Sequence, residues 1–255
     1  MSPADAPRVI VVGAGPVGLA AALLLDAQGH RVTVYEAKKE LKLSDANSYP
    51  IGVNLRGQET LRRIDPALLD RLRAEGEVVA ALSIYSGTRR VASLASGTLI
   101  ATTRAFLTGL LLERVRGTRT ITYRAGHALA RVDLAGRTLT FTRPNGEEVT
   151  VDARDARVLA ADGVWSATRR SLTEQVPGFM HRAGDWCVRF RVACPQPHAS
   201  APGLDPSIHH IFTSKGIYTA TLQDGVWGVA VTAIEGDPAE ELLLSTDASE
   251  ADIAR

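Results

Sequence analysis

Three glycines near the start of the chain have the spacing of a phosphate-binding turn. They stand in Gly13-Ala14-Gly15-Pro16-Val17-Gly18, directly after the apolar run Val9–Val12. In such a turn the first glycine permits a tight bend, the second lets a pyrophosphate approach the backbone, and the third lets a helix pack closely on a strand. The phosphates then lie on the amides at the N-terminus of that helix. A turn that binds nothing is the simpler alternative.

The residues around the glycines predict a strand–turn–helix–strand unit, which makes a binding role more specific than the glycines alone. Val9–Val12 is typical of a buried parallel strand. A helix is expected from about Val17 to Gln28, and "HRVTVYE" alternates into a second strand that ends at Glu36. The carboxylate of Glu36 could accept both ribose hydroxyls, which disfavours the additional phosphate of NADP in this site. The sequence therefore predicts a dinucleotide with a free ribose. FAD is favoured over NAD because the spacing resembles that of FAD-binding enzymes of the glutathione-reductase type, which place small or apolar residues and a turn glycine at Ala22, Leu25, Gly29, Val32 and Val34.

Composition and charge exclude several other classes of protein. The 255 residues are 45% hydrophobic and 22% charged, and 29 basic against 28 acidic residues give a net charge of +1. No nucleic-acid or membrane surface is therefore expected. Asp26 interrupts the first apolar stretch too early for a transmembrane segment, which needs about 20 residues. The two cysteines, Cys187 and Cys194, fit no metal or redox motif, and without an export signal they favour the cytoplasm. No metal site and no catalytic triad is expected.

Two further segments carry residues that could do chemistry. "TTRAFLTGLLLERV" predicts a helix with Arg104 in its first turn, where the helix dipole favours anions, so this guanidinium is expected to meet a negative group or, alternatively, the solvent. "RVLAADGVWSATRRSL" predicts a strand, the turn Asp162-Gly163 and a helix capped by Ser166 or Thr168. Asp162 would lie at the carboxyl end of a strand, where open α/β sheets bind ligands, although a plain Asp-Gly turn is the alternative.

The remaining stretches predict a helix and further strands. A helix is expected from about Arg56, and Asn145-Gly146 is expected to turn a β-hairpin. Residues from about 179 to 235 alternate like antiparallel strands. In this part the pair His209-His210 would direct one ring to each face of a sheet, so at most one ring could reach a substrate. A structural or solvent role is favoured, and a metal site of two histidines lacks further ligands.

Together these segments resemble the single-component FAD-dependent aromatic hydroxylases, the class A flavoprotein monooxygenases, and most of all their kynurenine monooxygenase-like branch. The resemblance rests on the glycine turn with Glu36, "YPIGVNLRGQETL", "TTRAFL" and "AADGVWSATRR". It implies an α/β fold with a Rossmann-like FAD-binding domain of the glutathione-reductase type and an interleaved antiparallel-sheet substrate domain. The implied bounds are 1–75 and 99–178 for the FAD-binding domain, and 76–98 and 179–255 for the substrate domain.

The resemblance implies which residues would hold the pyrophosphate of FAD. The glycine turn would cradle it through Gly13, Gly15, Val17 and Gly18. Arg104 would reach the same group from its helix.

The resemblance also assigns residues to the two ends of FAD. Glu36 and Lys38 would meet the adenosine ribose, and the backbone of Leu129 would neighbour the adenine. Gly52 would lie against the flavin ring region.

Asp162 and Gly163 match an Asp-Gly motif that serves the FAD pyrophosphate and the transient reductant NADPH, and Arg169 would support it. Such enzymes reduce FAD with NADPH and use oxygen to hydroxylate an aromatic small molecule. The cofactor supplies the reactivity, while the protein positions the substrate and excludes water.

The sequence departs from the family pattern in three places. Ala161 precedes Asp162 where the family usually has glycine or cysteine. "VVAALSIYSG" and "SLASGTLIATT" hold no counterpart of the arginine and tyrosine that bind the substrate carboxylate in kynurenine hydroxylases, so kynurenine is not the expected substrate. A third flavin segment, a Gly-Asp motif, normally follows the stretch where this chain stops, so an N-terminal portion or a truncated member is expected. The alternatives are an FAD-dependent reductase, a halogenase-like flavoprotein or a non-catalytic flavin-binding remnant.

Overall fold

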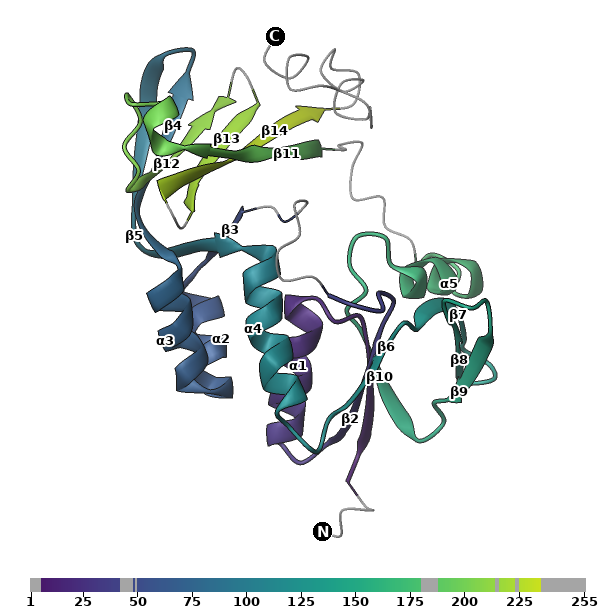
Figure 1. Ribbon diagram of the computed structural model, residues 1–255. Helices are drawn as coiled ribbons and strands as arrows, with labels where there is room; N and C mark the ends of the chain where they lie inside the picture. The colour runs from purple at the N-terminus through teal and green to yellow at the C-terminus, as the bar shows by residue number, and fades with distance from the viewer. Residues whose placement is uncertain are drawn as a thin grey trace. The chain divides into compact units, whose positions relative to one another are not determined.

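The computed structural model describes residues 6–41, 48, 50–179, 188–213, 216–222 and 225–234 (Figure 1). Its contacts divide the chain into two compact units. The first unit comprises 1–44, 59–69 and 105–181, and the second unit comprises 45–58, 70–104 and 182–255. The chain therefore passes repeatedly between the units.

A parallel four-stranded sheet in the order β10-β1-β2-β6 forms the centre of the first unit. Its strands are β1 (Arg8–Val12), β2 (Arg31–Glu36), β6 (Thr122–Ala125) and β10 (Ala156–Ala160). Helix α1 (Pro16–Ala27) connects β1 to β2. This arrangement confirms the predicted strand–turn–helix–strand unit, including the end of its second strand at Glu36.

Three helices between these strands complete the helical part of the chain's first half. They are α2 (Leu55–Ile64), α3 (Pro66–Glu75) and α4 (Arg104–Arg116). Helices α2 and α4 confirm the two helices expected at these positions. None of the helices among the described residues is long and apolar enough to cross a membrane.

A small antiparallel sheet covers one face of the parallel sheet. It consists of β7 (Ala128–Asp133), β8 (Thr138–Thr142) and β9 (Glu148–Asp152) in that order, and α5 (Ala167–Gln175) packs against β7. The predicted turn at Asn145-Gly146 connects β8 to β9. Gly146 adopts a φ of +82°, in the left-handed region that such a turn favours.

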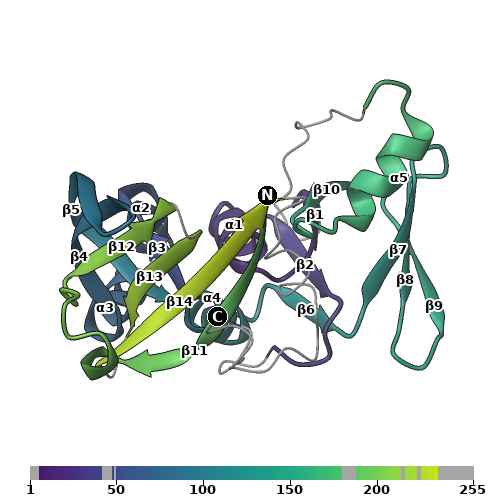
Figure 2. The same cartoon turned by 90° about the horizontal axis from the view of Figure 1, so that it is seen from above.

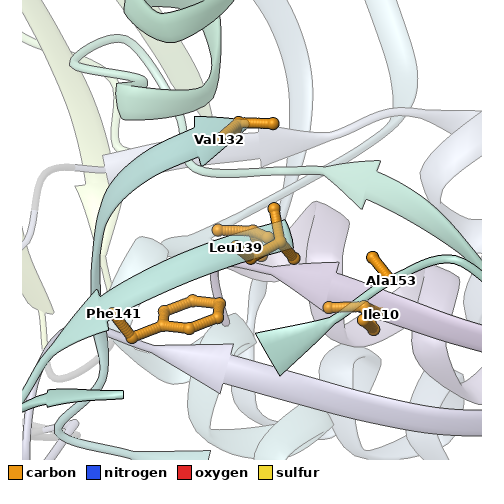
Figure 3. Packing of buried hydrophobic residues seen from close by; sticks show 6 residues of the cluster. Ile10, Val132, Leu139, Phe141 and Ala153 are labelled. Carbon is orange, nitrogen blue, oxygen red and sulfur yellow. The ribbon is translucent and has the colours of Figure 1, made fainter. Parts of the chain in front are cut away.

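The core between the two sheets explains why β1 is apolar from Val9 to Val12. Ile10 and Val12 of β1 cluster with four buried residues of the small sheet and its flank, namely Val132, Leu139, Phe141 and Ala153 (Figure 3). Because side chains alternate along a strand, Val9 and Val11 face the opposite side, where both views place α1 and α4. These four residues of β1 are buried, as expected for a strand covered on both faces.

The second unit is built on a seven-stranded sheet in the order β11-β14-β13-β12-β4-β5-β3, and Figure 2 shows β12, β13 and β14 side by side. Its strands are β3 (Pro50–Val53), β4 (Glu77–Ser86), β5 (Arg89–Thr103), β11 (Val188–Pro197), β12 (Ile208–Phe212), β13 (Ile217–Leu222) and β14 (Val226–Ile234). Neighbouring strands are antiparallel, as expected, except that β12 runs parallel to β4. The connection from β11 to β12 begins with the short 3-10 helix His198–Ser200.

The contacts group the segments 45–58, 70–75 and 99–104 with the second unit because β3 pairs with the end of β5, and β5 pairs with β4. The bounds predicted for the FAD-binding domain, 1–75 and 99–178, include these segments. The α/β class with a Rossmann-like parallel sheet is confirmed, while the exact domain bounds stay a prediction.

Phe141 tests whether the core between the sheets stabilises the first unit. Its side chain is fully buried and stacks on Tyr35, so Phe141→Ala should lower the free energy of unfolding of this unit by about 3–5 kcal/mol. Urea denaturation, monitored through the hydrogen exchange of the β8 amides, measures this loss. Val158→Ala on β10 is the control, because Val158 is 40% exposed, and it should cost much less. Equal losses in the two variants would contradict the assignment.

Candidate dinucleotide-binding site

The turn between β1 and α1 requires two of its three glycines for reasons within the protein itself. Gly13 adopts a φ of +99°, and a Cβ there would lie 2.5 Å from the carbonyl oxygen of Ala161. A Cβ at Gly18 would collide with the carbonyl oxygen of Gly13. These two glycines therefore let the turn and α1 pack against the chain that follows β10.

Gly15 has a different reason to be glycine. A Cβ at this position would meet no atom within 4 Å, so the described protein does not itself demand the missing side chain. Gly15 is the N-cap of α1, and the first turn of that helix contains no acidic residue. The amides of Val17 and Gly18 belong to this turn, where helix geometry leaves N–H groups without intrahelical acceptors. Open space beside such amides fits a pyrophosphate.

The carboxylate of Glu36 is fixed by two backbone amides. Its Oε2 accepts a hydrogen bond from Ala14 N at 2.8 Å, and its Oε1 accepts one from Lys38 N at 2.9 Å. The first bond ties the end of β2 to the glycine turn, and the second fixes the chain after β2. Each carboxylate oxygen keeps a further lone pair, so Glu36 can still accept hydrogen bonds from hydroxyl groups.

The loop after β10 is organised around Asp162. One carboxylate oxygen accepts from Ser166 Oγ at 2.7 Å, and the other accepts from the backbone N and the Oγ1 of Thr168, each at 3.0 Å. Ser166 also caps α5 by accepting from Arg169 N at 2.9 Å, and the Arg169 guanidinium donates to Val164 O. Asp162 therefore fixes its own loop through its side chain.

This loop adjoins the glycine turn through its backbone. The Cβ position of Gly13 lies 3.0 Å from the Cα of Asp162, and Gly163 adopts a φ of +77°. Asp162 and Gly163 were predicted from the sequence, but the hydrogen bonds that join Asp162 to both Ser166 and Thr168 were not. The spacing of Asp162, Ser166 and Thr168 around the start of α5 is the sequence signal that could have predicted these bonds.

The small antiparallel sheet is attached to the same end of β2. Leu129 packs its side chain against the core, opposite Phe141, so its backbone is the part that a ligand could meet. The rings of Tyr35 and Phe141 stack with centroids 4.3 Å apart, and His127 N donates to Glu36 O at 2.8 Å. Sequence analysis did not identify Tyr35 or His127, because their contacts join segments distant in the chain.

The other two residues predicted to meet the cofactor belong to the second unit. Gly52 lies on β3 opposite Ala101, and Arg104 is the exposed first residue of α4. The remaining predicted residues, from Gly13 to Gly163, belong to the first unit. The structure therefore brings together those at the glycine turn, the end of β2 and the Asp162 loop.

One histidine of the pair for which a structural or solvent role was favoured is buried in the second unit. His209 is fully buried, and its Nδ1 lies 2.5 Å from the hydroxyl of Tyr218. Burial, assisted by the nearby His210, lowers the pKa of His209 to about 4, and burial raises the pKa of Tyr218 to about 12. Both side chains are therefore neutral at pH 7.

His210 lies on the opposite face, as the alternation predicted. The pairing of β12 with β4 aligns His209 with Leu82 and His210 with Ser83. His210 uses both ring nitrogens, at 3.2 Å from the Tyr85 hydroxyl and at 3.0 Å from Asp205 O.

The parallel sheet, the glycine turn with open space at Gly15, and a fixed carboxylate at the end of β2 define a dinucleotide-binding domain of the Rossmann type. The model of the family described as FAD binding domain matches residues 7–211, and the chain belongs to this family.

The relatives extend this assignment. Kynurenine 3-monooxygenase of Yarrowia lipolytica is 29% identical over 240 residues, which cover 86% of this chain and 50% of that enzyme. Kynurenine 3-monooxygenase of Phaeosphaeria nodorum is 28% identical over 198 residues, covering 67% of this chain and 39% of that enzyme. The chain thus spans half or less of the length of these relatives. The resemblance to class A flavoprotein monooxygenases is confirmed.

Solved structures show the same fold. p-Nitrophenol 4-monooxygenase PnpA from Pseudomonas putida DLL-E4 superposes with a TM-score of 0.72 at 20% identity, covering 98% of this chain and 60% of that one. The flavin-dependent monooxygenase PieE, crystallised with FAD and substrate, gives a TM-score of 0.71 at 19% identity, covering 99% of this chain and 46% of that one.

The low pKa of His209 makes the stability of the second unit depend on pH. The unfolded chain binds a proton at the ordinary histidine pKa of 6.5, whereas the folded chain binds it only near 4. The stabilisation is therefore complete above pH 6.5 and is lost as the pH falls to 4, by about 3 kcal/mol. Thermal unfolding between pH 7 and pH 4 measures this loss, which should be smaller in His209→Gln. An equal pH dependence in the two proteins would contradict the shift.

Proposed function

We propose that this protein is an FAD-dependent monooxygenase that hydroxylates an aromatic small molecule with NAD(P)H and oxygen, in the cytoplasm. The observation that carries the proposal is the carboxylate of Glu36, fixed beside a glycine turn whose middle glycine faces open space. Such a site is complementary to the ribose and the pyrophosphate of one dinucleotide at the same time. Membership of the FAD binding domain family favours FAD as that dinucleotide.

The pyrophosphate would lie at the N-terminus of α1. The amides of Val17 and Gly18 would donate hydrogen bonds to it, and Gly15 would leave room for its approach. Gly13 would hold the turn in shape. Arg104 would contribute a guanidinium, whose planar fork suits two phosphate oxygens.

The adenosine would lie at the end of β2. Glu36 would accept hydrogen bonds from the ribose hydroxyls while its two backbone contacts keep it in place. Lys38 would adjoin the same ribose, and the backbone of Leu129 would border the adenine. Tyr35 would contribute indirectly, because its ring stacks on Phe141 and so fixes the small sheet that carries Leu129.

The loop after β10 would serve the phosphates from the other side of the turn. The Asp162 carboxylate keeps this loop rigid, so the backbone of Asp162 and Gly163 would present a fixed surface to the FAD pyrophosphate and to the transient NADPH. Gly52 would lie along the flavin ring region.

Bound FAD would supply the redox chemistry, in which NAD(P)H and oxygen convert an aromatic C–H to C–OH with release of NAD(P)⁺ and water. The chain's own part is to bind the cofactor, to orient the aromatic ring and to exclude water from the reacting atoms. Kynurenine is not the proposed substrate, because the segments "VVAALSIYSG" and "SLASGTLIATT" hold no counterpart of the arginine and tyrosine that bind the substrate carboxylate in kynurenine hydroxylases.

The test of this function is oxygen-dependent oxidation of NADPH, measured together with product analysis over a panel of phenols and other aromatic compounds. We expect an aromatic substrate to accelerate NADPH consumption and to appear as a product with one additional oxygen. Reduction of FAD that is indifferent to every aromatic compound would indicate a reductase. FAD binding without any reduction would indicate a non-catalytic flavoprotein.

Glu36→Gln tests the ribose contact. The amide keeps the size of the side chain but replaces one acceptor oxygen with a donor, so FAD affinity should fall by about 1–3 kcal/mol. A titration with FAD, monitored through the quenching of flavin fluorescence, measures the change in affinity. Glu148→Gln, at the exposed first residue of β9, is the matched control and should leave the affinity unchanged. Equal FAD affinity in wild type and Glu36→Gln would rule out Glu36 as the ribose ligand.

A further inference from the structure

The second unit contains a buried hydrogen-bonding atom that its described neighbours leave unused. Nε2 of His209 is shielded from solvent and has no hydrogen-bond partner among the described residues. Most buried polar side-chain atoms have a partner, because an unpaired one loses its hydration without compensation. This nitrogen is therefore a candidate for binding a ligand.

The contact between His209 and Tyr218 determines what the free nitrogen can offer. Nδ1 is the one described partner of the Tyr218 hydroxyl, and both groups are neutral at pH 7. A proton on Nδ1 would leave the tyrosine proton without an acceptor. The arrangement that satisfies the pair has Tyr218 donating to Nδ1, which places the imidazole proton on Nε2. His209 then presents a single N–H donor.

The strand register connects this donor with the segment assigned to the flavin ring. Continuing the pairing of His210 with Thr219 brings His209 opposite Ala220, which in turn pairs with Gly228. All three residues share one face of the sheet. On that face Pro50 of β3 lies close over Gly228, because a Cβ there would be 3.2 Å from the Pro50 Cγ. Gly52, expected at the flavin ring, is two residues further along the same strand.

We propose that the Nε2–H of His209 is the specificity-determining donor that recognises an oxygen acceptor on a neutral aromatic substrate. This inference rests on the proposed function, since it places the substrate ring beside the β3 segment. A neutral imidazole offers no positive charge to balance a carboxylate, so the substrate class is a phenol, aromatic amide or aromatic ketone in preference to an aromatic acid.

Small residues adjoin His209 on its face of the sheet. Ala220 and Gly228 add little bulk to the sheet face beside the imidazole. The Leu222 side chain lies 2.8 Å from the Cβ position of Gly228, and it is the flexible group that would move aside to admit a ring. The other buried atoms without partners in this described sheet, Ser83 Oγ and Trp227 Nε1, belong to the opposite face, which carries His210.

The experiment compares three aromatic probes of similar size on the full chain in the presence of FAD. Benzamide is neutral and carries a carbonyl acceptor, benzoate carries a charge, and toluene has no acceptor. Saturation-transfer NMR titrations give their dissociation constants. We expect benzamide to bind about tenfold more tightly than either other probe, the effect of one buried hydrogen bond.

The variants separate recognition by His209 from a structural role. His209→Phe should bind benzamide and toluene equally, while His209→Gln, which restores an N–H donor, should recover part of the preference. Tyr218→Phe keeps the imidazole but removes the hydroxyl that fixes its proton, so the preference should fall. His210→Gln, on the same strand but the opposite face, is the matched control and should keep the preference.

Three results would overturn the inference: benzoate binding as tightly as benzamide, a benzamide preference that survives in His209→Phe, or no binding of any probe. FAD titrated in the same samples distinguishes this failure from failure of the proposed function. Normal FAD binding without the benzamide preference contradicts only the role of His209. A benzamide preference in a chain that does not bind FAD contradicts the proposed function instead.

Discussion

The hydrogen bonds from Ala14 N and Lys38 N to the Glu36 carboxylate are the constraint on which the first unit's candidate site depends. The bond from Ala14 N joins the glycine turn to the end of β2, across the whole of α1, and the bond from Lys38 N fixes the chain that follows β2. A carboxylate oriented in this way before a ligand arrives loses little freedom on binding, so its contacts contribute more fully to affinity. The site's polarity is also divided: amides at the helix N-terminus suit phosphate, and the carboxylate suits hydroxyls.

The fold keeps this constraint in place from both faces of the parallel sheet. On one face the small antiparallel sheet packs Phe141 and Leu139 against β1 and stacks on Tyr35, the residue before Glu36. On the other face α1 approaches so closely that Gly18 can have no side chain. The loop after β10 contacts Gly13 through its backbone and is itself fixed by Asp162. The candidate site is therefore rigid on three sides for reasons of packing and hydrogen bonding.

The sequence was sufficient wherever a local pattern determined the structure. The β1–α1–β2 unit, α4, the turn at Asn145-Gly146 and the cap at Ser166 follow from periodicity, glycine spacing and capping chemistry within short windows. Alternation also placed His209 and His210 on opposite faces. What could not be predicted depends on pairing between distant segments: the parallel pairing of β12 with β4, the stacking of Tyr35 on Phe141, and the unpaired Nε2 of His209 among the described residues. A periodic pattern gives the face of a side chain but not the atoms it meets there.

The central claim is that the described site of the first unit binds the adenosine diphosphate half of FAD. Competition against bound FAD tests it most directly, with ADP and FMN as the competitors and the FAD that stays on the protein after gel filtration as the measurement. ADP contains the ribose and the pyrophosphate that Glu36 and the glycine turn would hold, whereas FMN contains neither the adenosine nor the pyrophosphate. The account predicts that ADP displaces FAD and that FMN at the same concentration does not. Displacement by FMN with no effect of ADP would contradict it.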